Sequence, residues 1–225
     1  MSVILNNLHF SYPGSRLATL EIDHWAVNSG EAVFLQGQSG TGKSTLLNLI
    51  SGVLSGATGE VSVLGQRLDA MSGSQRDRFR ANHIGYVFQQ FNLVPYLDAL
   101  DNIRLANRFS SRKQSPERPL SEIQALLDDL QLSETDWSKP ASHLSIGQQQ
   151  RVAIARALVN QPEVLIADEP TSSLDQENRD NFMQVLMKRV ERDGITLIFV
   201  SHDRTLEHHF KRVERLSGIN RAGGR

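Results

Sequence analysis

Apolar and polar residues alternate in two N-terminal segments, and shorter unbroken apolar runs recur further along the chain. Val3 to Phe10 and Leu20 to Val27 alternate with a period of roughly two, which is typical of strands with one buried face. Further strands are predicted at residues 31–36, 59–64, 84–88, 164–167 and 196–200. The run 164–167 has no polar position, which is typical of a strand that is buried on both faces of a parallel sheet.

Apolar positions spaced three and four residues apart predict helices between these strands. Leu46, Leu47, Leu49 and Ile50 share one face of a helix that begins near Lys43. The other predicted helices are at residues 74–82, 145–159 and 176–192, with two more within 98–132 that are separated by the polar stretch 110–119. Strands that alternate with helices indicate an α/β fold with a mostly parallel sheet. The tail, residues 219–225, is rich in glycine and arginine and is expected to fray.

Composition narrows the classes of protein that remain. The 225 residues suffice for one large domain or two small ones. The absence of Cys excludes a disulfide scaffold and a cysteine nucleophile. A balance of 24 Lys and Arg against 25 Asp and Glu argues against a nucleic-acid partner, because neutralising many phosphates requires an excess of positive charge. No apolar run approaches the ~20 residues of a membrane span. We therefore expect a soluble, cytoplasmic chain that reaches any membrane through a partner.

Residues 37–44, Gly-Gln-Ser-Gly-Thr-Gly-Lys-Ser, match the phosphate-binding pattern G-x-x-x-x-G-K-[ST]. An apolar strand precedes the pattern and an apolar helix follows it, which disfavours the alternative of a simple glycine-rich turn. Glycines let backbone N–H groups approach a polyphosphate, and the helix points the positive end of its dipole at the anion. Lys43 is expected to contact the β- and γ-phosphates, and Ser44 to ligate Mg²⁺.

Two acids, Asp168 and Glu169, directly follow the apolar run 164–167. A parallel strand presents its C-terminal residues to the ligand crevice of an α/β sheet. Neighbouring side chains on an extended backbone point in opposite directions, so the two carboxylates can serve different tasks. We expect Asp168 to face Mg²⁺ and Glu169 to face the water that attacks the γ-phosphorus. A surface pair of acids at a strand end is the alternative.

A further motif places the chain beside a known family. Residues 144–148, Leu-Ser-Ile-Gly-Gln, resemble the signature sequence L-S-G-G-Q of the ATP-binding cassette (ABC) ATPases. Tyr12 resembles that family's adenine-stacking aromatic, Gln89 its lid glutamine, and His202 its switch histidine on the γ-phosphate. Residues 172–175, Ser-Ser-Leu-Asp, resemble the loop that contacts the opposite subunit.

These motifs also have plainer interpretations when each is taken alone. Gln90 fits the lid position as well as Gln89 does, and the family's register selects Gln89. Tyr12 is compatible with a packing aromatic. His202 is compatible with a structural or capping histidine. The order of all the motifs along the chain favours the functional interpretation in each case.

The resemblance implies one cassette over residues 1–225: a P-loop NTPase core with a RecA-like, mostly parallel sheet, an N-terminal antiparallel β part and an inserted α-helical subdomain. The core would take residues 1–90 and 160–225, and the helical subdomain about 91–159. ATP and Mg²⁺ are the implied cofactors. The implied catalytic residues are Lys43, Gln89, Glu169 and His202, and the implied metal ligands are Ser44, Gln89 and Asp168. The implied nucleotide-binding residues are Tyr12, Gly37, Ser39, Gly40, Thr41, Gly42, Lys43, Ser44, Thr45, Gln89, Asp168, Ser145, Gly147 and Gln148.

The resemblance also implies a function, an ATP-hydrolysing subunit of an ABC transporter. Two copies would assemble head to tail around two ATP–Mg and drive a separate integral-membrane permease, on the cytoplasmic face of the inner or plasma membrane. The alternative is a regulatory or mechanotransmission ABC ATPase that moves a membrane partner without carrying cargo. A DNA-repair or translation cassette is disfavoured, because the chain has no basic arm and no excess positive charge.

Within the family, residues 88–95, Phe-Gln-Gln-Phe-Asn-Leu-Val-Pro, are similar to the lipoprotein-release and macrolide-exporter group. Two positions depart from the expected pattern. Ile146 stands where the signature has its first glycine, so its side chain is expected to point away from the phosphate. Ser172 and Ser173 stand where the exporter group often has Gly-Asn.

Overall fold

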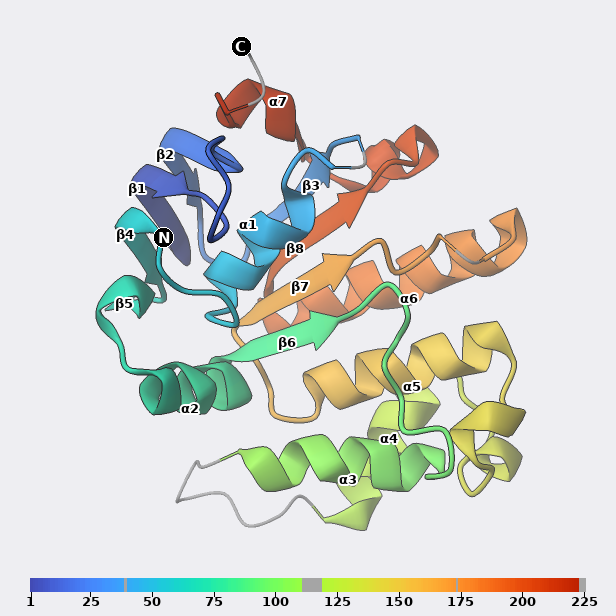
Figure 1. The fold of residues 1–225 in the computed structure, drawn as a ribbon. Coiled ribbons are helices and arrows are strands. Elements are labelled where there is room, and N and C mark those ends of the chain that lie inside the picture. The colour runs from blue at the N-terminus through green and yellow to red at the C-terminus, as the bar shows by residue number, and fades with distance from the viewer. Residues whose placement is uncertain (39, 111–118, 173, 223–225) are drawn as a thin grey trace.

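The computed structural model describes residues 1–38, 40–110, 119–172 and 174–222, and Figure 1 shows the arrangement of their helices and strands. The strands are β1 (Val3–Phe10), β2 (Leu20–Val27), β3 (Ala32–Gln36), β4 (Thr58–Val63), β5 (Gln66–Arg67), β6 (Ile84–Val87), β7 (Val164–Asp168), β8 (Thr196–Ser201) and β9 (Arg212–Arg215). The helices are α1 (Lys43–Ile50), α2 (Gly73–His83), α3 (Ala99–Phe109), α4 (Leu120–Asp129), α5 (Ile146–Leu158), α6 (Gln176–Asp193) and α7 (Leu216–Ile219). Single 3-10 turns occur at Leu68–Ala70, Glu134–Asp136 and Ala141–His143, and a longer 3-10 segment at Arg204–His209.

A parallel sheet forms the centre of the molecule. Within the described residues its strand order is β6-β7-β8-β3-β9, and every adjacent pair is parallel. The α/β fold predicted from the sequence is therefore confirmed. The strands are in register at their carboxyl ends, where Asp168 pairs with Val200 and Gln36 with Ser201. Polar residues that follow these strands consequently gather at the carboxyl end of the sheet.

The antiparallel β part is a separate sheet with the order β2-β1-β4-β5 within the described residues. Helix α1 lies between the two sheets, as Figure 1 shows. Its Leu46, Leu47 and Ile50 are fully buried in a core that joins both sheets. Burial on both sides accounts for the broad apolar face of this short helix and fixes the helix relative to the strand β3 that precedes it.

Helices α3, α4 and α5 lie beside β6 and share the second hydrophobic core with α6 and the opposite face of the parallel sheet (Figure 1). Helix α5 contributes Val152, Ala153 and Ile154 to this core. None of the helices in the described part of the chain has both the length and the apolar character needed to cross a membrane.

The C-terminal region differs from the sequence prediction. The sequence does not predict strand β9, because Arg-Val-Glu-Arg contains only one apolar residue. β9 is an edge strand, so its faces do not have to be buried and an apolar run is not required. The expected fraying is wrong for Ile219 to Ala222: α7 ends at Ile219, and the side chain of Asn220 is only 8% exposed. The last predicted tail residues, 223–225, lie outside the described part of the chain.

Candidate active site

The phosphate-binding pattern forms the connection between β3 and α1. Gly42 is the N-cap of α1 and has a φ of +97°, and a Cβ there would lie 2.9 Å from Leu20 Cδ2. A Cβ on Gly37 would lie 2.9 Å from Thr41 Oγ1. Gly42 therefore requires glycine because of its left-handed backbone and close packing, and a Cβ at Gly37 would displace the Thr41 side chain. Ser39, a predicted nucleotide-binding residue, lies outside the described residues.

Lys43 is folded back into this loop. Its ammonium group donates to the carbonyl oxygens of Gly37 at 2.6 Å and Gln38 at 3.1 Å. The same Nζ lies 3.2 Å from Glu169 Oε1, and both side chains are mostly buried, at 8% and 14% exposure. An ion pair shielded in this way retains more of its Coulomb attraction than a surface pair. The loop lysine and the acid after β7 therefore belong to one site.

Asp168 and Glu169 diverge at the end of β7. Asp168 Oδ2 accepts a hydrogen bond of 3.2 Å from Ser44 Oγ. Burial raises the pKa of the Asp168 carboxyl, and the charge of Glu169 raises it further. The expectation of a continuous extended backbone is wrong at Glu169, whose φ is +46°. Its N–H donates to the carbonyl of Val200, which holds this turn against β8. The two carboxylates still reach different partners, but the left-handed turn produces the separation.

His202 follows β8 and completes the group. Its Nδ1 lies 2.8 Å from Glu169 Oε2, and the side chain is 63% exposed. A carboxylate is an acceptor, so this contact fixes the proton on Nδ1 and leaves Nε2 directed at other partners when the ring is neutral. Glu169 is thus held between a lysine from the phosphate loop and a histidine from the neighbouring strand.

Tyr12 lies on the connection between β1 and β2, beside the helix that carries the phosphate loop. Its hydroxyl is 3.1 Å from Thr45 Oγ1, and its ring meets Phe10 edge to face at a centroid distance of 5.1 Å. The side chain is nevertheless 45% exposed. The contacts orient the ring, and a part of its surface remains accessible to a ligand. The ring therefore packs against Phe10 and also keeps the exposed surface that base stacking would need.

Gln89 is exposed in a turn that follows β6. Val87, the last residue of β6, pairs with Ala167, so Gln89 lies at the same carboxyl end of the sheet as Asp168. Among the described residues it donates no hydrogen bond to the pair formed by Ser44 and Asp168. The structure therefore brings two of the three predicted metal ligands into contact and leaves the third at the same edge.

The signature residues lie elsewhere, at the start of α5. Ser145 is the N-cap: its Oγ accepts from Gln148 N, and Gln148 Oε1 accepts from Ser145 N in a reciprocal capping box. Gln148 Nε2 also donates to Asp136 Oδ2 at 2.6 Å. Ile146 is 51% exposed and Gly147 is next to it, so both lie at the surface of the chain.

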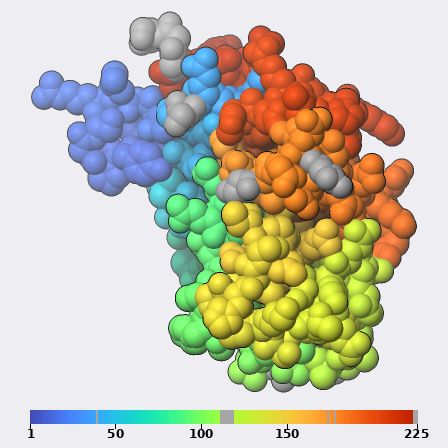
Figure 2. All heavy atoms as spheres, turned by 90° about the vertical axis from the view of Figure 1, so that its right-hand side faces the viewer, coloured from blue at the N-terminus to red at the C-terminus, as the bar shows by residue number. Residues whose placement is uncertain are grey.

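Figures 1 and 2 show that the signature lies apart from the phosphate loop of the same chain. In Figure 1 the yellow N-terminal end of α5 lies away from α1. In Figure 2 the yellow part of the surface, which has the colour of the start of α5, and the light-blue part, which has the colour of α1, have green and orange surface between them. The two motifs of one chain therefore do not form a common site by themselves.

Sequence reasoning missed several polar residues that support this site. Gln150 is 1% exposed and donates from Nε2 to the carbonyl of Pro170 at 2.7 Å, so it ties the signature helix to the residue after Glu169. Arg179 of α6 forms an ion pair with Asp203, the neighbour of His202. Gln150 was detectable from the sequence, because a polar residue on the apolar face of a helix indicates a buried hydrogen bond.

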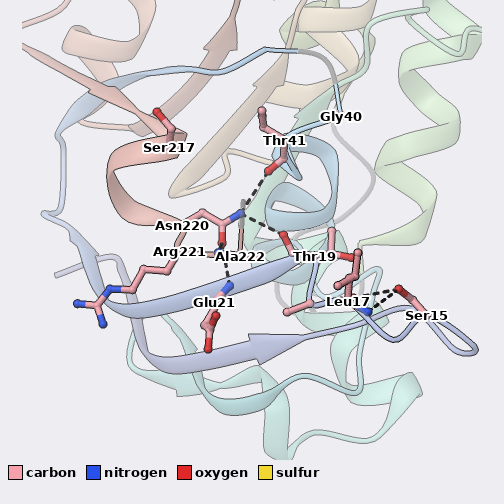
Figure 3. Close-up of a pocket in the computed structure, with 11 residues that line it drawn as sticks. Ser15, Leu17, Thr19, Glu21, Gly40, Thr41, Ser217, Asn220, Arg221 and Ala222 are labelled. Carbon is pink, nitrogen blue, oxygen red and sulfur yellow. Dashed lines mark hydrogen bonds between the residues drawn. The ribbon is translucent and has the colours of Figure 1, made fainter. Parts of the chain in front are cut away.

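Two hollows flank the phosphate loop. One of about 460 Å³ is bordered by Gly37, Gln38, His202 and Arg204, among others. The other, of about 860 Å³, is an open hollow bordered by the connection that follows Tyr12, by the loop and by the C-terminal segment. Figure 3 shows its lining. The structure therefore has open space for a ligand on both sides of the phosphate loop.

Comparison with known proteins agrees with this geometry. The family model described as "ABC transporter" matches residues 20–172. An uncharacterized ABC transporter ATP-binding protein of Escherichia coli K12, YbbA, is 43% identical over 190 residues, covering 84% of this chain and 82% of that protein. The macrolide export ATP-binding/permease protein MacB of Rhodopirellula baltica is 37% identical over 84% of this chain, but the match spans only 28% of MacB.

A solved structure is similar over nearly the whole chain. The ATP-binding cassette MJ0796 of Methanocaldococcus jannaschii, in a dimeric post-hydrolysis state bound to ADP and Pi, superposes with a TM-score of 0.85 at 35% identity. The match covers 95% of this chain and 93% of that one. The helical insertion and the antiparallel part thus belong to the shared fold.

The parallel sheet, the glycine-rich loop with its lysine and the acids after β7 define this chain as a P-loop nucleoside triphosphatase. The comparisons make the family specific: the chain belongs to the ABC transporter family and is an ATP-binding cassette ATPase of the kind that forms the ATP-binding subunit. Its relatives include macrolide-export proteins, in agreement with the group that residues 88–95 resemble.

Proposed function

We propose that the residues gathered at the carboxyl edge of the parallel sheet bind and hydrolyse ATP. The observation that carries this proposal is the contact of Glu169 with both Lys43 and His202. Lys43 exchanges its loop carbonyl partners for phosphate oxygens, and the glycine-rich loop supplies backbone N–H groups. Glu169 orients the attacking water as a general base, and His202 senses the γ-phosphate. Tyr12 stacks on the base, and Thr45 keeps the Tyr12 hydroxyl in place.

Ser44 and Asp168 fit a Mg²⁺ site, with Gln89 as the third ligand. The fit rests on two oxygen donors already 3.2 Å apart at the loop, which is the ligand type that Mg²⁺ prefers. A metal ion bound there would neutralise charge on the phosphate oxygens. Burial beside Glu169 raises the pKa of Asp168 because it leaves the negative charge poorly solvated, and a cation bound there would compensate that charge.

We further propose that two copies close head to tail around two ATP molecules. The support is the separation of the signature from the phosphate loop in one chain, together with the dimeric state of the MJ0796 cassette. Ser145, Gly147 and Gln148 of one copy would complete the site of the other, with the free N–H groups of the α5 N-terminus facing phosphate. Residues of about 91–159 would act as a helical subdomain that carries this signature to the partner. Hydrolysis would then release the dimer.

Gly147→Glu is expected to abolish dimer formation while the monomer binds ATP with unchanged affinity. A Cβ at Gly147 has its nearest neighbour, Asn178 Oδ1, at 4.0 Å, so the substitution fits the fold. The added carboxylate would face the phosphates of the second copy and repel them. Size-exclusion chromatography with light scattering, in a non-hydrolysable ATP analogue, measures the dimer. Ser142→Glu adds the same charge at an exposed position nearby and should dimerise normally. A Gly147→Glu dimer as stable as wild type would contradict the head-to-tail arrangement.

The membrane partner would dock at a groove beside β6. The groove has a volume of about 690 Å³ and is bordered by Tyr86, Phe88 and Phe109, among others. Phe109 is 70% exposed, so a large apolar side chain is available to a partner at this groove. Arg156 lines the groove and donates to the carbonyls of Phe91 and Asn92, so α5 and the Gln89 turn are joined there. Docking of an integral-membrane permease would place this chain on the cytoplasmic face of the membrane and couple site closure to export.

Phe109→Glu is expected to reduce recovery of the membrane partner by about tenfold, because a charge replaces exposed apolar contact area. The tagged chain is purified from native membranes, and the bound membrane protein is identified and quantified. Val213→Glu is the matched control: Val213 is 42% exposed on β9, at the opposite edge of the sheet from β6. Equal recovery with both variants would contradict docking at the groove. A captured partner that shows no cargo transport would favour the mechanotransmission alternative.

A further inference from the structure

The C-terminal segment is packed against the nucleotide side of the molecule. Leu216 of α7 is fully buried in the core that also contains α1. Beyond α7, the N–H of Arg221 donates to the carbonyl of Glu21 on β2 at 2.8 Å, and the Arg221 side chain pairs with Asp23. The segment therefore runs along the first half of β2, close to the connection that carries Tyr12.

Asn220 is the centre of this contact. Its Oδ1 accepts from the N–H of Glu21 at 2.8 Å and of Ala222 at 3.1 Å. Its Nδ2 donates to the carbonyls of Thr19 at 3.1 Å and Thr41 at 3.3 Å. Two N–H groups on one side and two carbonyls on the other fix the orientation of the amide and use all its bonding capacity. Figure 3 shows these bonds converging on the side chain from three parts of the chain.

The two carbonyls that share Nδ2 belong to the two halves of the nucleotide site. Thr41 is in the phosphate loop, directly before Gly42 and Lys43. Thr19 closes the connection that carries Tyr12, since its N–H donates to the carbonyl of Phe10 at 2.8 Å. The Thr19 carbonyl also borders Gly42, where a Cβ would lie 3.1 Å from it. Two carbonyl oxygens that face one another repel unless a donor lies between them.

We propose that Asn220 is a positioning residue that sets the distance between the base-stacking ring and the phosphate loop. Its NH₂ group fastens the loop to the Tyr12 connection, and α7 anchors the amide in the core. The C-terminal segment thereby holds the two ends of one ATP molecule in register. This inference rests on the proposed binding of ATP at the loop and at Tyr12, and it adds a residue that touches neither the base nor the phosphates.

Asn220→Asp removes the donor and adds one negative charge. The carboxylate keeps the shape of the side chain and still accepts from the N–H groups of Glu21 and Ala222. Its second oxygen faces the carbonyls of Thr19 and Thr41, where the NH₂ group donated before. We expect the Kd for ATP–Mg to rise about tenfold, the loss of one shared donor. The Kd for tripolyphosphate–Mg should change by less than about twofold, since that ligand needs only the phosphate end. Calorimetric titration of the full chain measures both. Asn220→Ala, which adds no charge, should shift the two affinities in the same unequal way.

Trp25→Phe is the matched control for loss of stability. Trp25 donates from Nε1 to Glu214 Oε2 at 2.6 Å, so this change removes one link between β2 and β9 without touching the loop. Its melting temperature is expected to fall, while both affinities stay at wild-type values. An Asn220→Asp variant with unchanged affinity for ATP would overturn the proposal, and so would equal weakening of ATP and tripolyphosphate. Failure of the wild-type chain to bind ATP would instead refute the proposed function.

Discussion

Glu169→Gln is expected to lower the ATP turnover number by about 10²- to 10⁴-fold, the usual contribution of a general base. The amide keeps the size of the side chain but cannot take a proton from the attacking water. ATP affinity should change by less than about threefold, because Lys43 and the loop amides remain in place. Phosphate release by the purified chain and by its membrane complex measures turnover, and calorimetric titration measures affinity.

Glu163→Gln is the control for Glu169→Gln. Glu163 directly precedes β7 and contacts His83, so the same substitution falls at the other end of this strand, away from the site. This control should keep wild-type turnover. Wild-type turnover of Glu169→Gln with intact ATP binding would remove Glu169 from the catalytic role, and the contact with His202 would then be structural only.

Lys43→Ala is expected to weaken ATP binding by about 10- to 100-fold, the effect of removing charge-assisted hydrogen bonds to phosphate. The substitution also leaves Glu169 without its buried ion-pair partner. A carboxylate that keeps only its contact with His202 would lie near the phosphates and add repulsion to the lost attraction. Calorimetric titration measures the affinity, and a thermal melt records how far the loss of the ion pair lowers the stability of the fold.

Lys188→Ala controls for a general loss of positive charge. Lys188 is exposed on α6 and lies outside the nucleotide site. Its removal should leave ATP affinity and the melting temperature near wild type. An ATP affinity of Lys43→Ala equal to that of Lys188→Ala would show that the phosphates bind away from the loop.

The strands and helices that surround the site were predictable because their apolar patterns are strong. Each buried strand of the parallel sheet is a nearly unbroken apolar run, and α1 and α5 carry broad apolar faces. The unpredicted elements have the opposite character. Strand β9 is mostly charged, and its place at the sheet edge is set by pairing with β3 rather than by its own composition. Local pattern carries no information about such a partner.

The residues of the site were predictable as types, and their mutual contacts were not. The pattern around Lys43 and the acids after β7 identify phosphate chemistry, because few other functions need these residues in this context. That Glu169 lies between Lys43 and His202 follows from strand order, since β7, β8 and β3 are neighbours in space and far apart in sequence. The left-handed turn at Glu169 was missed, because nothing in an acid at a strand end indicates a positive φ.

The sequence by itself determined the class of fold through the apolar patterns of single segments, and its motifs in their order indicated the family. Only the tertiary structure decided which groups touch. Asn220 shows the difference. In the sequence it belongs to a glycine- and arginine-rich tail, and in the fold its amide donates to the carbonyls of Thr19 and Thr41, which precede it by 201 and 179 residues. A hydrogen bond between distant segments depends on the packing of α7 in the core, and that packing is a property of the whole folded chain.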